Sequence, residues 1–166
     1  MGHLISSIRS LSEAMLQKIA GKLSPLFKSG DIIALSGNLG VGKSTFARAF
    51  IRESLSNPDE EVPSPTFTLA QQYIPDDAQK PEIWHFDFYR LENPKDAIEL
   101  GIEDAFNEGV CLIEWPQKID TLLPQDCLII KIKSGKGEDT RFLEFYGNDL
   151  WETRLKSKLT DPLLLA

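Results

Sequence analysis

Cysteine is scarce in this chain of 166 residues, where only Cys111 and Cys127 occur, both inside apolar, strand-like runs. Buried free thiols are the expected state of such residues, so neither a disulfide framework nor a cysteine-based metal site is indicated. Long hydrophobic runs are also lacking, since no segment approaches the roughly 18 apolar residues of a membrane helix. Residues 1–8 do not show the basic and apolar pattern of a secretory signal. We therefore expect a cytoplasmic protein that does not enter a membrane.

Positive charge is in short supply as well. The chain has 18 Lys and Arg residues against 25 Asp and Glu residues, a net charge of −7, and no dense basic run. Proteins that bind nucleic acid unaided usually present a basic face to the phosphates, so such binding is not expected here. The 42% of hydrophobic residues is enough for a packed core, which excludes disorder. The length fits one domain over residues 1–166.

The apolar periodicity predicts alternating helices and strands. An opening amphipathic helix is expected over residues 11–27, with Ser10 and Glu13 as a capping box, and a last helix is expected after Asn148. Further helices are predicted at 43–55 and at 94–107, the latter broken near Gly101. Strands are predicted at 31–36, 66–73, 83–89, 110–113, 127–133 and 141–146. This pattern indicates a compact α/β domain in which helices flank a mostly parallel central sheet, with an antiparallel hairpin.

The strongest motif lies between the predicted strand 31–36 and the predicted helix 43–55. Its residues are Gly37, Asn38, Leu39, Gly40, Val41, Gly42, Lys43, Ser44 and Thr45, which match the Walker A pattern G-x-x-x-x-G-K-[ST]. Glycines allow the loop to wrap a phosphate with backbone N–H groups, and the following helix directs its positive dipole end at the same anion. Lys43 adds positive charge on the outer phosphates, and the Ser44 hydroxyl can ligate Mg²⁺. The sequence therefore predicts a P-loop NTPase domain.

Three classes of P-loop protein remain to be compared. A small GTPase needs a guanine-reading N-K-x-D motif, and the segment 117–120, Gln-Lys-Ile-Asp, lacks its Asn and is preceded by no D-x-x-G. A small-molecule kinase normally closes an arginine-bearing lid over the phosphates, and residues 91–140 contain no arginine. A hydrolytic switch is therefore favoured. The kinase, and an adaptor that binds nucleotide but hydrolyses little, stay open as alternatives.

Hydrolysis needs acids that organise a metal and a polar group that senses the γ-phosphate. Glu114 directly follows the predicted strand 110–113, Asp87 lies on the polar face of the strand 83–89, and Thr66 lies in a Pro-rich turn that could act as a switch. Plainer interpretations exist for each acid. Glu114 could be a solvated strand end, Asp87 could pair with Arg90 on the surface, and His85 is expected to be an ordinary core residue.

Four sequence blocks together are more distinctive than a Walker A motif alone. They are Gly-Asn-Leu-Gly-Val-Gly-Lys-Ser-Thr-Phe at 37–46, Ser-Pro-Thr-Phe-Thr-Leu at 64–69, His-Phe-Asp-Phe-Tyr-Arg-Leu at 85–91 and Leu-Ile-Glu-Trp-Pro at 112–116. In this order they resemble the TsaE family (also known as YjeE), the small bacterial ATPases of tRNA threonylcarbamoyladenosine biosynthesis. The likeness covers most of residues 32–116 and becomes loose beyond Pro116.

The resemblance implies an ATPase that works within a complex and uses ATP or ADP with Mg²⁺. Its partners would be TsaB- and TsaD-type proteins, of which TsaD transfers the threonylcarbamoyl group to an adenosine beside the tRNA anticodon. Hydrolysis would support multiple turnover rather than make the modification. Contact with tRNA would fall mainly to the partners, which suits the acidic composition, and the isolated protein is expected to be a monomer.

The resemblance also assigns roles to individual residues. The loop 37–45, with Lys43, would hold the phosphates, Ser44 and Glu114 would organise Mg²⁺ with Asp87 close by, and Lys43, Asp87 and Glu114 would act in catalysis. Thr66 would belong to the first switch region.

Trp115 would belong to the second switch region, and Ser12 and Lys136 would contact the nucleotide. Asn38 stands where the family usually has Asp, and Ser44 stands where Thr is common. Since both hydroxyls can ligate Mg²⁺, the second difference should be mild.

Overall fold

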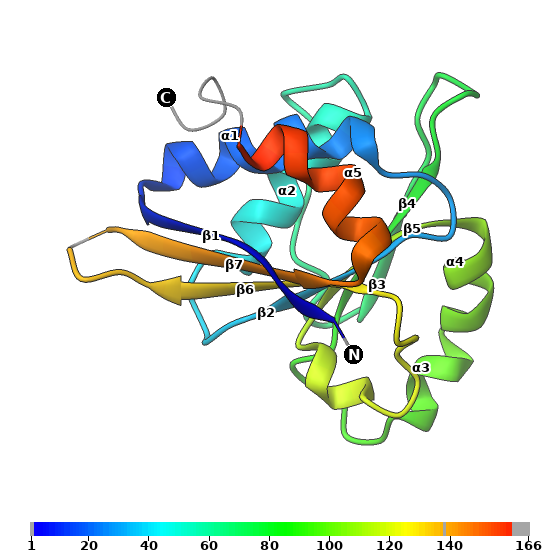
Figure 1. Ribbon diagram of the computed structural model, residues 1–166. Helices are drawn as coiled ribbons and strands as arrows, with labels where there is room; N and C mark the ends of the chain where they lie inside the picture. Colours follow the sequence, from blue (N-terminus) through cyan, green and yellow to red (C-terminus); the bar gives the residue numbers. More distant parts are fainter. Residues whose placement is uncertain (1, 138, 161–166) are drawn as a thin grey trace.

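A single sheet of seven strands organises the computed structural model, which describes residues 2–137 and 139–160 (Figure 1). The strands are β1 (His3–Leu11), β2 (Ile32–Ser36), β3 (Ala70–Tyr73), β4 (Glu82–Asp87), β5 (Gly109–Glu114), β6 (Leu128–Ser134) and β7 (Arg141–Gly147). Their order is β1-β7-β6-β2-β5-β4-β3. The central strands β4, β5, β2 and β6 are parallel, whereas β3 and β7 run antiparallel to their neighbours. The predicted mostly parallel sheet with an antiparallel hairpin is confirmed.

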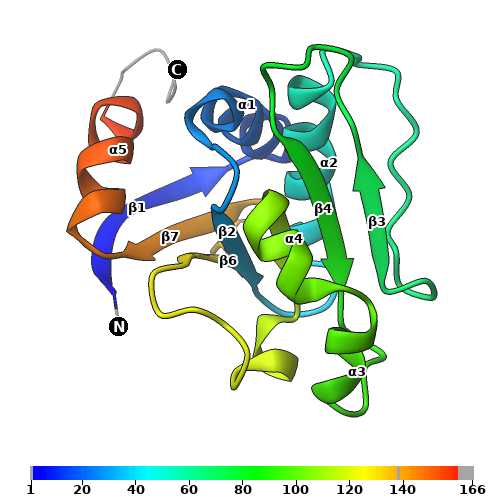
Figure 2. The ribbon, with the colours of Figure 1, turned by 90° about the vertical axis from the view of Figure 1, so that its right-hand side faces the viewer.

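Helices cover both faces of the sheet (Figure 1 and Figure 2). One face carries α1 (Glu13–Leu23), α2 (Lys43–Ser54) and α5 (Asp149–Leu159), and the other carries α3 (Lys95–Glu99) and α4 (Ile102–Glu108). Two short 3₁₀ turns, η1 (Ser24–Leu26) and η2 (Pro116–Ile119), complete the described elements. Along β2, Ile33 and Leu35 pack on the α1–α2 side, while Ile32 and Ala34 pack on the α3–α4 side. Such two-sided burial explains why this strand is almost continuously apolar.

The N-terminal region differs from the prediction. Ser10 lies inside strand β1, which was not predicted, and the helix begins at Glu13. Its N-cap is Ser12, whose side chain accepts a hydrogen bond from the Met15 N–H at 3.2 Å. The predicted capping box at Ser10 is therefore wrong. Strand β1 exists because it pairs with β7, more than a hundred residues away in the chain, which a local pattern does not reveal.

Other boundaries follow local signals. Gly101 adopts φ +83° and separates α3 from α4, as predicted, and the Asn148 side chain caps α5 by accepting from the Trp151 N–H. The predicted strand 66–73 begins only at Ala70. Leu69 has φ +66°, and its N–H donates to the Pro65 carbonyl at 2.7 Å, so residues 65–69 form a turn instead.

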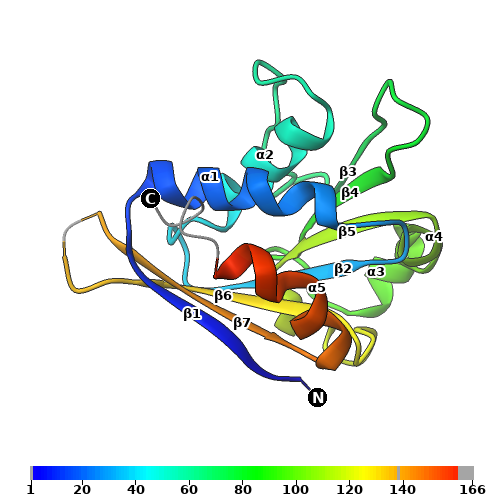
Figure 3. The same ribbon diagram turned by 45° about the horizontal axis from the view of Figure 1, so that its top comes forward.

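The β6–β7 hairpin extends past the body of the sheet on the side where α1 begins (Figure 3). Arg141, the first residue of β7, pairs with Ser134 of β6 and with Leu11 at the end of β1. The hairpin thus returns the chain to the carboxyl end of β2, so Arg141 is brought close to the candidate site described below.

Candidate functional site

The candidate site lies where the central parallel strands end. The loop 37–45 leaves the end of β2, Glu114 ends β5 and Asp87 ends β4, and the last two are paired across the β4–β5 ladder. The carboxyl ends of parallel strands are where ligands bind in open α/β sheets. A cleft of about 430 Å³ opens here, and its lining residues are Glu13, Leu16, Leu39, Gly40, Gly42, Lys43, Ser44, Thr45, Ser64, Thr66, Asp87, Tyr89, Glu114, Trp115 and Arg141.

The loop 37–45 is held in a shape that glycine alone fits. A Cβ at Gly37 would lie 2.4 Å from the Ile132 carbonyl oxygen, and one at Gly42, where φ is +123°, would lie 2.9 Å from Leu16 Cδ2. Helix α2 starts at Lys43, so the backbone N–H groups of its first turn have no intrahelical acceptors. The loop and this helix end together provide donors for an anion.

Lys43 is buried at the floor of the cleft. Its Nζ donates to the carbonyl oxygens of Gly37 at 2.5 Å and Asn38 at 2.9 Å, and lies 4.2 Å from the centre of the Trp115 ring. Burial lowers the pKa of Lys43, while the charges of Glu114 and Asp87 act in the opposite direction. Trp115 itself adopts φ +58°, a left-handed conformation that turns the chain directly after β5.

The Glu114 side chain is buried, and both of its carboxylate oxygens accept hydrogen bonds. Oε1 accepts from the Ser44 hydroxyl at 2.8 Å, and Oε2 accepts from His85 Nε2 at 2.7 Å. His85 Nδ1 is buried and has no hydrogen-bond partner among the described residues, so the ring uses its other nitrogen to hold Glu114. The plain interpretations of Glu114 as a solvated strand end and of His85 as a mere core residue do not describe these contacts.

Asp87 organises the opposite wall of the cleft. Its Oδ2 accepts from the hydroxyls of Ser64 at 2.9 Å and Thr66 at 3.1 Å, and its Oδ1 accepts from the Tyr89 N–H. Arg90 does not pair with Asp87 but stacks on an exposed aromatic ring, that of Phe67, at 4.5 Å. The turn that contains Thr66 is therefore tied to the end of β4.

The donor atoms at this edge fit a magnesium–nucleotide complex. The Ser44 hydroxyl and the Glu114 carboxylate are hydrogen-bonded to each other, and the Asp87 carboxylate follows on the neighbouring strand. Oxygen ligands from one or two carboxylates and from a hydroxyl, together with phosphate oxygens, are what Mg²⁺ prefers. They lie beside the first turn of α2, whose free backbone N–H groups can bind an anion.

Leu39 lies at the edge of this centre, and Val41, Ser12 and Lys136 lie outside the residues that line the cleft. Leu39 is 70% exposed at the mouth of the cleft, whereas Val41 is buried and its carbonyl accepts from Arg141 Nε at 2.6 Å. Ser12 caps α1 and does not line the cleft. Lys136 is exposed in the β6–β7 hairpin and does not line it either. Contacts of Ser12 and Lys136 with a nucleotide stay predictions.

Five lining residues were not predicted as site residues from the sequence: Glu13, Leu16, Ser64, Tyr89 and Arg141. Ser64 and Tyr89 belong to blocks that resemble the TsaE family, so that signal was available. Arg141 belongs to no recognisable sequence motif. The argument against a kinase was that residues 91–140 contain no arginine. The β6–β7 hairpin nevertheless brings Arg141, just beyond that segment, to the cleft, so this argument does not hold.

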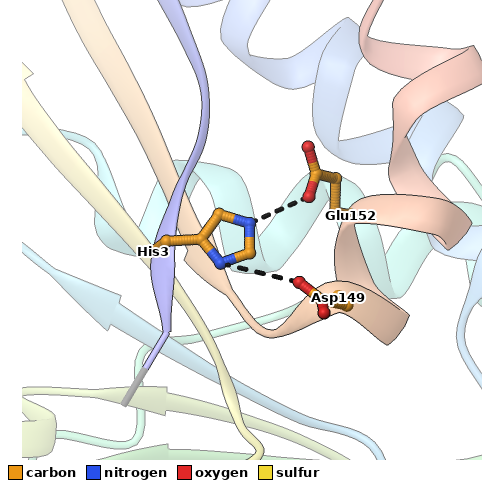
Figure 4. A group of neighbouring side chains, drawn as sticks. All are labelled: His3, Asp149 and Glu152. Carbon is orange, nitrogen blue, oxygen red and sulfur yellow. Dashed lines mark hydrogen bonds and ion pairs between the residues drawn. The ribbon is translucent and has the colours of Figure 1, made fainter.

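A second group of potential metal ligands lies at the other end of the sheet, where β1 begins (Figure 4). His3 Nε2 is 2.9 Å from Glu152 Oε2, and His3 Nδ1 is 3.9 Å from Asp149 Oδ1. The two ring nitrogens face different carboxylates, so the imidazole bridges the two acids rather than converging with them on one point. All three side chains are substantially exposed, and the group is explained as a tie between β1 and the first turn of α5.

No helix within residues 2–137 and 139–160 is both long enough and apolar enough to cross a bilayer.

Comparisons with known proteins agree with the geometry. The family model for the threonylcarbamoyl adenosine biosynthesis protein TsaE matches residues 10–143. The chain is 41% identical over 130 residues to the tRNA threonylcarbamoyladenosine biosynthesis protein TsaE of Bacillus subtilis, covering 77% of each chain. It is 37% identical to the protein of the same name from Rickettsia conorii, covering 74% of this chain and 68% of the relative. The crystal structure of YdiB from Bacillus subtilis superposes with a TM-score of 0.74 at 28% identity, over 96% of both chains. The chain belongs to the TsaE family.

Proposed function

We propose that this chain is a Mg²⁺-dependent ATPase subunit required for threonylcarbamoyladenosine modification of tRNA. It acts with TsaB- and TsaD-type partners in the cytoplasm, reaches tRNA through them, and is a monomer when isolated. One observation carries the proposal: the phosphate loop, the Ser44–Glu114–His85 chain of hydrogen bonds and the Asp87–Thr66 contact meet in one cleft. The assignment to threonylcarbamoyladenosine modification is taken from the names of the similar proteins.

The phosphates would be held by the loop 37–45. Backbone N–H groups at the start of α2 bind the anion, and Lys43 exchanges the carbonyl oxygens of Gly37 and Asn38 for phosphate oxygens. Ser44, Glu114 and Asp87 would hold Mg²⁺, which neutralises charge that develops on the transferred phosphoryl group. Glu114 or Asp87 then orients the attacking water.

Two contacts link the phosphates to the surface. Thr66 is hydrogen-bonded to Asp87, and the Trp115 ring lies on the Lys43 ammonium group. When the γ-phosphate arrives or leaves, Lys43 and Asp87 change partners, so the segments of Thr66 and Trp115 move with them. Since partners complete such a switch, hydrolysis by the isolated subunit should be slow.

The test is release of free phosphate from ATP and Mg²⁺, with and without the TsaB- and TsaD-type proteins. Stimulation by the partners that a Lys43→Ala variant lacks is the expected result. Arg141 in the cleft keeps a phosphoryl-transfer enzyme as a second candidate, which would form ADP and a phosphorylated acceptor without free phosphate. An adaptor would bind nucleotide without turnover, and a Glu114→Ala variant would still bind partners in a nucleotide-dependent way.

A further inference from the structure

A second groove, of about 670 Å³, runs between helices α1 and α2 and is larger than the nucleotide cleft. Among the lining residues of the two cavities, only Thr45 is shared. Four of the residues that line the groove are cationic: Lys18 and Lys22 on α1, and Arg48 and Arg52 on α2. This α1–α2 groove takes no part in the chemistry described above.

The charge of the groove opposes that of the molecule. One acid, Glu53, lines the groove beside the four cations, so the lining carries a net charge of +3 (4 − 1) in a chain whose net charge is −7. On each helix the two cations are four residues apart and lie on the same side, where like charges repel and weaken a helix. Lys22 and Arg52 lie in the last turns of their helices, where a cation is stabilising, so helix stability accounts for these two cations but not for Lys18 and Arg48.

Within residues 2–137 and 139–160, the four cations have no acidic partners. Among the described residues, no carboxylate lies within 4.0 Å of Lys18, Lys22, Arg48 or Arg52. The Nε atoms of the two arginines donate to backbone carbonyls, Arg48 to Val62 at 3.3 Å and Arg52 to Glu60 at 3.0 Å. These bonds fix the half-buried guanidinium groups, whose other N–H groups have no partner in the described part of the chain.

We infer that the α1–α2 groove docks an acidic segment, rich in Asp and Glu, of a partner protein. The inference rests on the proposed function in that the partner belongs to the modification complex. Charge complementarity selects the occupant, because preplaced guanidinium groups bind carboxylates in a bidentate manner and the exposed lysines attract further acids. The small residues Gly21 and Ala49 also line the groove, and the Glu53 side chain lies beside Gly21.

Nucleic acid fits the groove less well. No aromatic side chain of the described residues lines it, so bases have nothing to stack on there, and four cations neutralise few phosphates. The net negative charge of the whole chain also repels a long polyanion more than a short acidic segment.

The groove is placed to respond to nucleotide. Both helices that form it also line the nucleotide cleft, α1 through Glu13 and Leu16, and α2 through residues 43–45. A segment docked between them therefore stabilises one arrangement of the two helices, and bound nucleotide stabilises the same or the other arrangement. A nucleotide-dependent shift of α1 against α2 would couple the two sites, and that coupling would be reciprocal.

The test compares a charge-reversed groove with a matched control. The groove variant is Lys18→Glu with Lys22→Glu, and the control is Lys118→Glu with Lys156→Glu, which makes the same change in net charge at exposed positions outside the groove. Affinity is measured by calorimetry for the TsaB–TsaD pair, and by fluorescence anisotropy for a labelled oligoglutamate peptide and for tRNA. Affinity for ATP with Mg²⁺ is measured on every variant.

The groove variant is expected to bind the TsaB–TsaD pair at least about tenfold more weakly than wild type, with its ATP affinity unchanged. The control should bind the pair like wild type, and raising the salt concentration should weaken only the proteins with an intact groove. Equal binding of the pair by groove variant and control would overturn the inference. So would tRNA binding, or self-association, that only the groove variant loses.

Failure of the proposed function gives a different result. If the wild type does not bind the TsaB–TsaD pair, the partner assignment fails. Binding of the oligoglutamate peptide then tests whether the groove binds an acidic segment. Binding of oligoglutamate by wild type and control, lost in the groove variant, would support an acidic occupant from another protein. No binding of the peptide by wild type would overturn the groove as well.

Discussion

At the scale of single residues, Gly37 is the most confined of the three glycines in the phosphate loop. A Cβ added at Gly37 would approach the Ile132 carbonyl oxygen to 2.4 Å, whereas a Cβ at Gly40 would meet nothing within 4 Å. We therefore expect Gly37→Ala to lower the free energy of unfolding by about 1–3 kcal/mol, the cost of overpacking. For a chain of this size that is roughly 2–4 °C in Tm per kcal/mol, measurable by calorimetry.

Gly40→Ala is the control for this substitution. Gly40 has φ +77°, so alanine there carries backbone strain of about 1–2 kcal/mol but no clash. The difference should appear in function more than in Tm, because only the Gly37 variant must displace the strand that supports the loop. Equal loss of ATP affinity in both variants would contradict the steric explanation.

His85 is a positioning residue for Glu114. Its Nε2–H holds one carboxylate oxygen, which leaves the other to Ser44 and to the proposed Mg²⁺. His85→Leu should raise the Mg²⁺ concentration needed for half-maximal ATP binding by about tenfold or more, as loss of such outer contacts does at metal sites. ATP binding in the presence of a chelator should change little. The measurement is a Mg²⁺ titration of nucleotide affinity.

A conservative variant separates positioning from packing. In His85→Gln the side-chain amide can donate from nearly the same place as Nε2, so it should recover part of the Mg²⁺ dependence that His85→Leu loses. A purely structural role predicts the reverse, that both variants lose Tm and lose affinity with and without Mg²⁺ to the same degree.

At the scale of elements, the sequence predicted what local chemistry controls. The break at Gly101 and the cap at Asn148 depend on a glycine and an amide acting on their own segments, and both predictions were confirmed. Strand β1 and the short β3 were not predicted correctly. Residues 3–11 become a strand only through pairing with β7, and residues 65–69 form a turn through the left-handed conformation of Leu69, which no propensity favours.

One ion pair fastens helix α5 to the start of β2. Arg154 Nη1 donates to Asp31 Oδ2 at 2.6 Å, and the nearly buried Asp31 also accepts from the Lys28 N–H. Arg154→Met keeps the apolar stem but removes the charged donor. We expect it to lower the free energy of unfolding by about 1.5–3 kcal/mol, as for hydrogen bonds to charged groups. Urea denaturation should show a lower midpoint with an unchanged m-value.

Lys156→Met, on the same helix at an exposed position, is the matched control for Arg154→Met. Surface substitutions of this kind usually change stability by less than about 0.5 kcal/mol. If the two variants lost equal stability, the Arg154–Asp31 pair would not be what holds α5 in place.

At the scale of the whole molecule, the site is assembled from segments that only the fold brings together. Residues 37–45 could be predicted because the loop is continuous, and Glu114 and Asp87 because parallel strands end at one edge. Arg141 could not, because its place depends on the register of β7 against β6 and β1. The sequence contains no mark of that register near Arg141.

Cys111 reports on the integrity of the core around β5. Cys111 is fully buried in β5, and burial raises the pKa of its thiol from 9.0 to about 12. Between these two pH values the unfolded chain loses the proton that the native protein keeps. The thiol therefore contributes stability that is complete below pH 9.0 and is lost as the pH rises toward about 12.

Cys111→Ala should consequently flatten the alkaline part of the stability curve. From this one thiol, the free energy of unfolding of the wild type should fall by up to about 1.4 kcal/mol per pH unit above pH 9, and that slope should be missing in the variant. Lys43, Tyr73 and Tyr146, whose pKa values are also shifted, are present in both proteins and cancel in the comparison. Urea denaturation at several pH values measures the difference. Parallel curves for wild type and variant would mean that the core around β5 opens to solvent before the rest of the molecule unfolds.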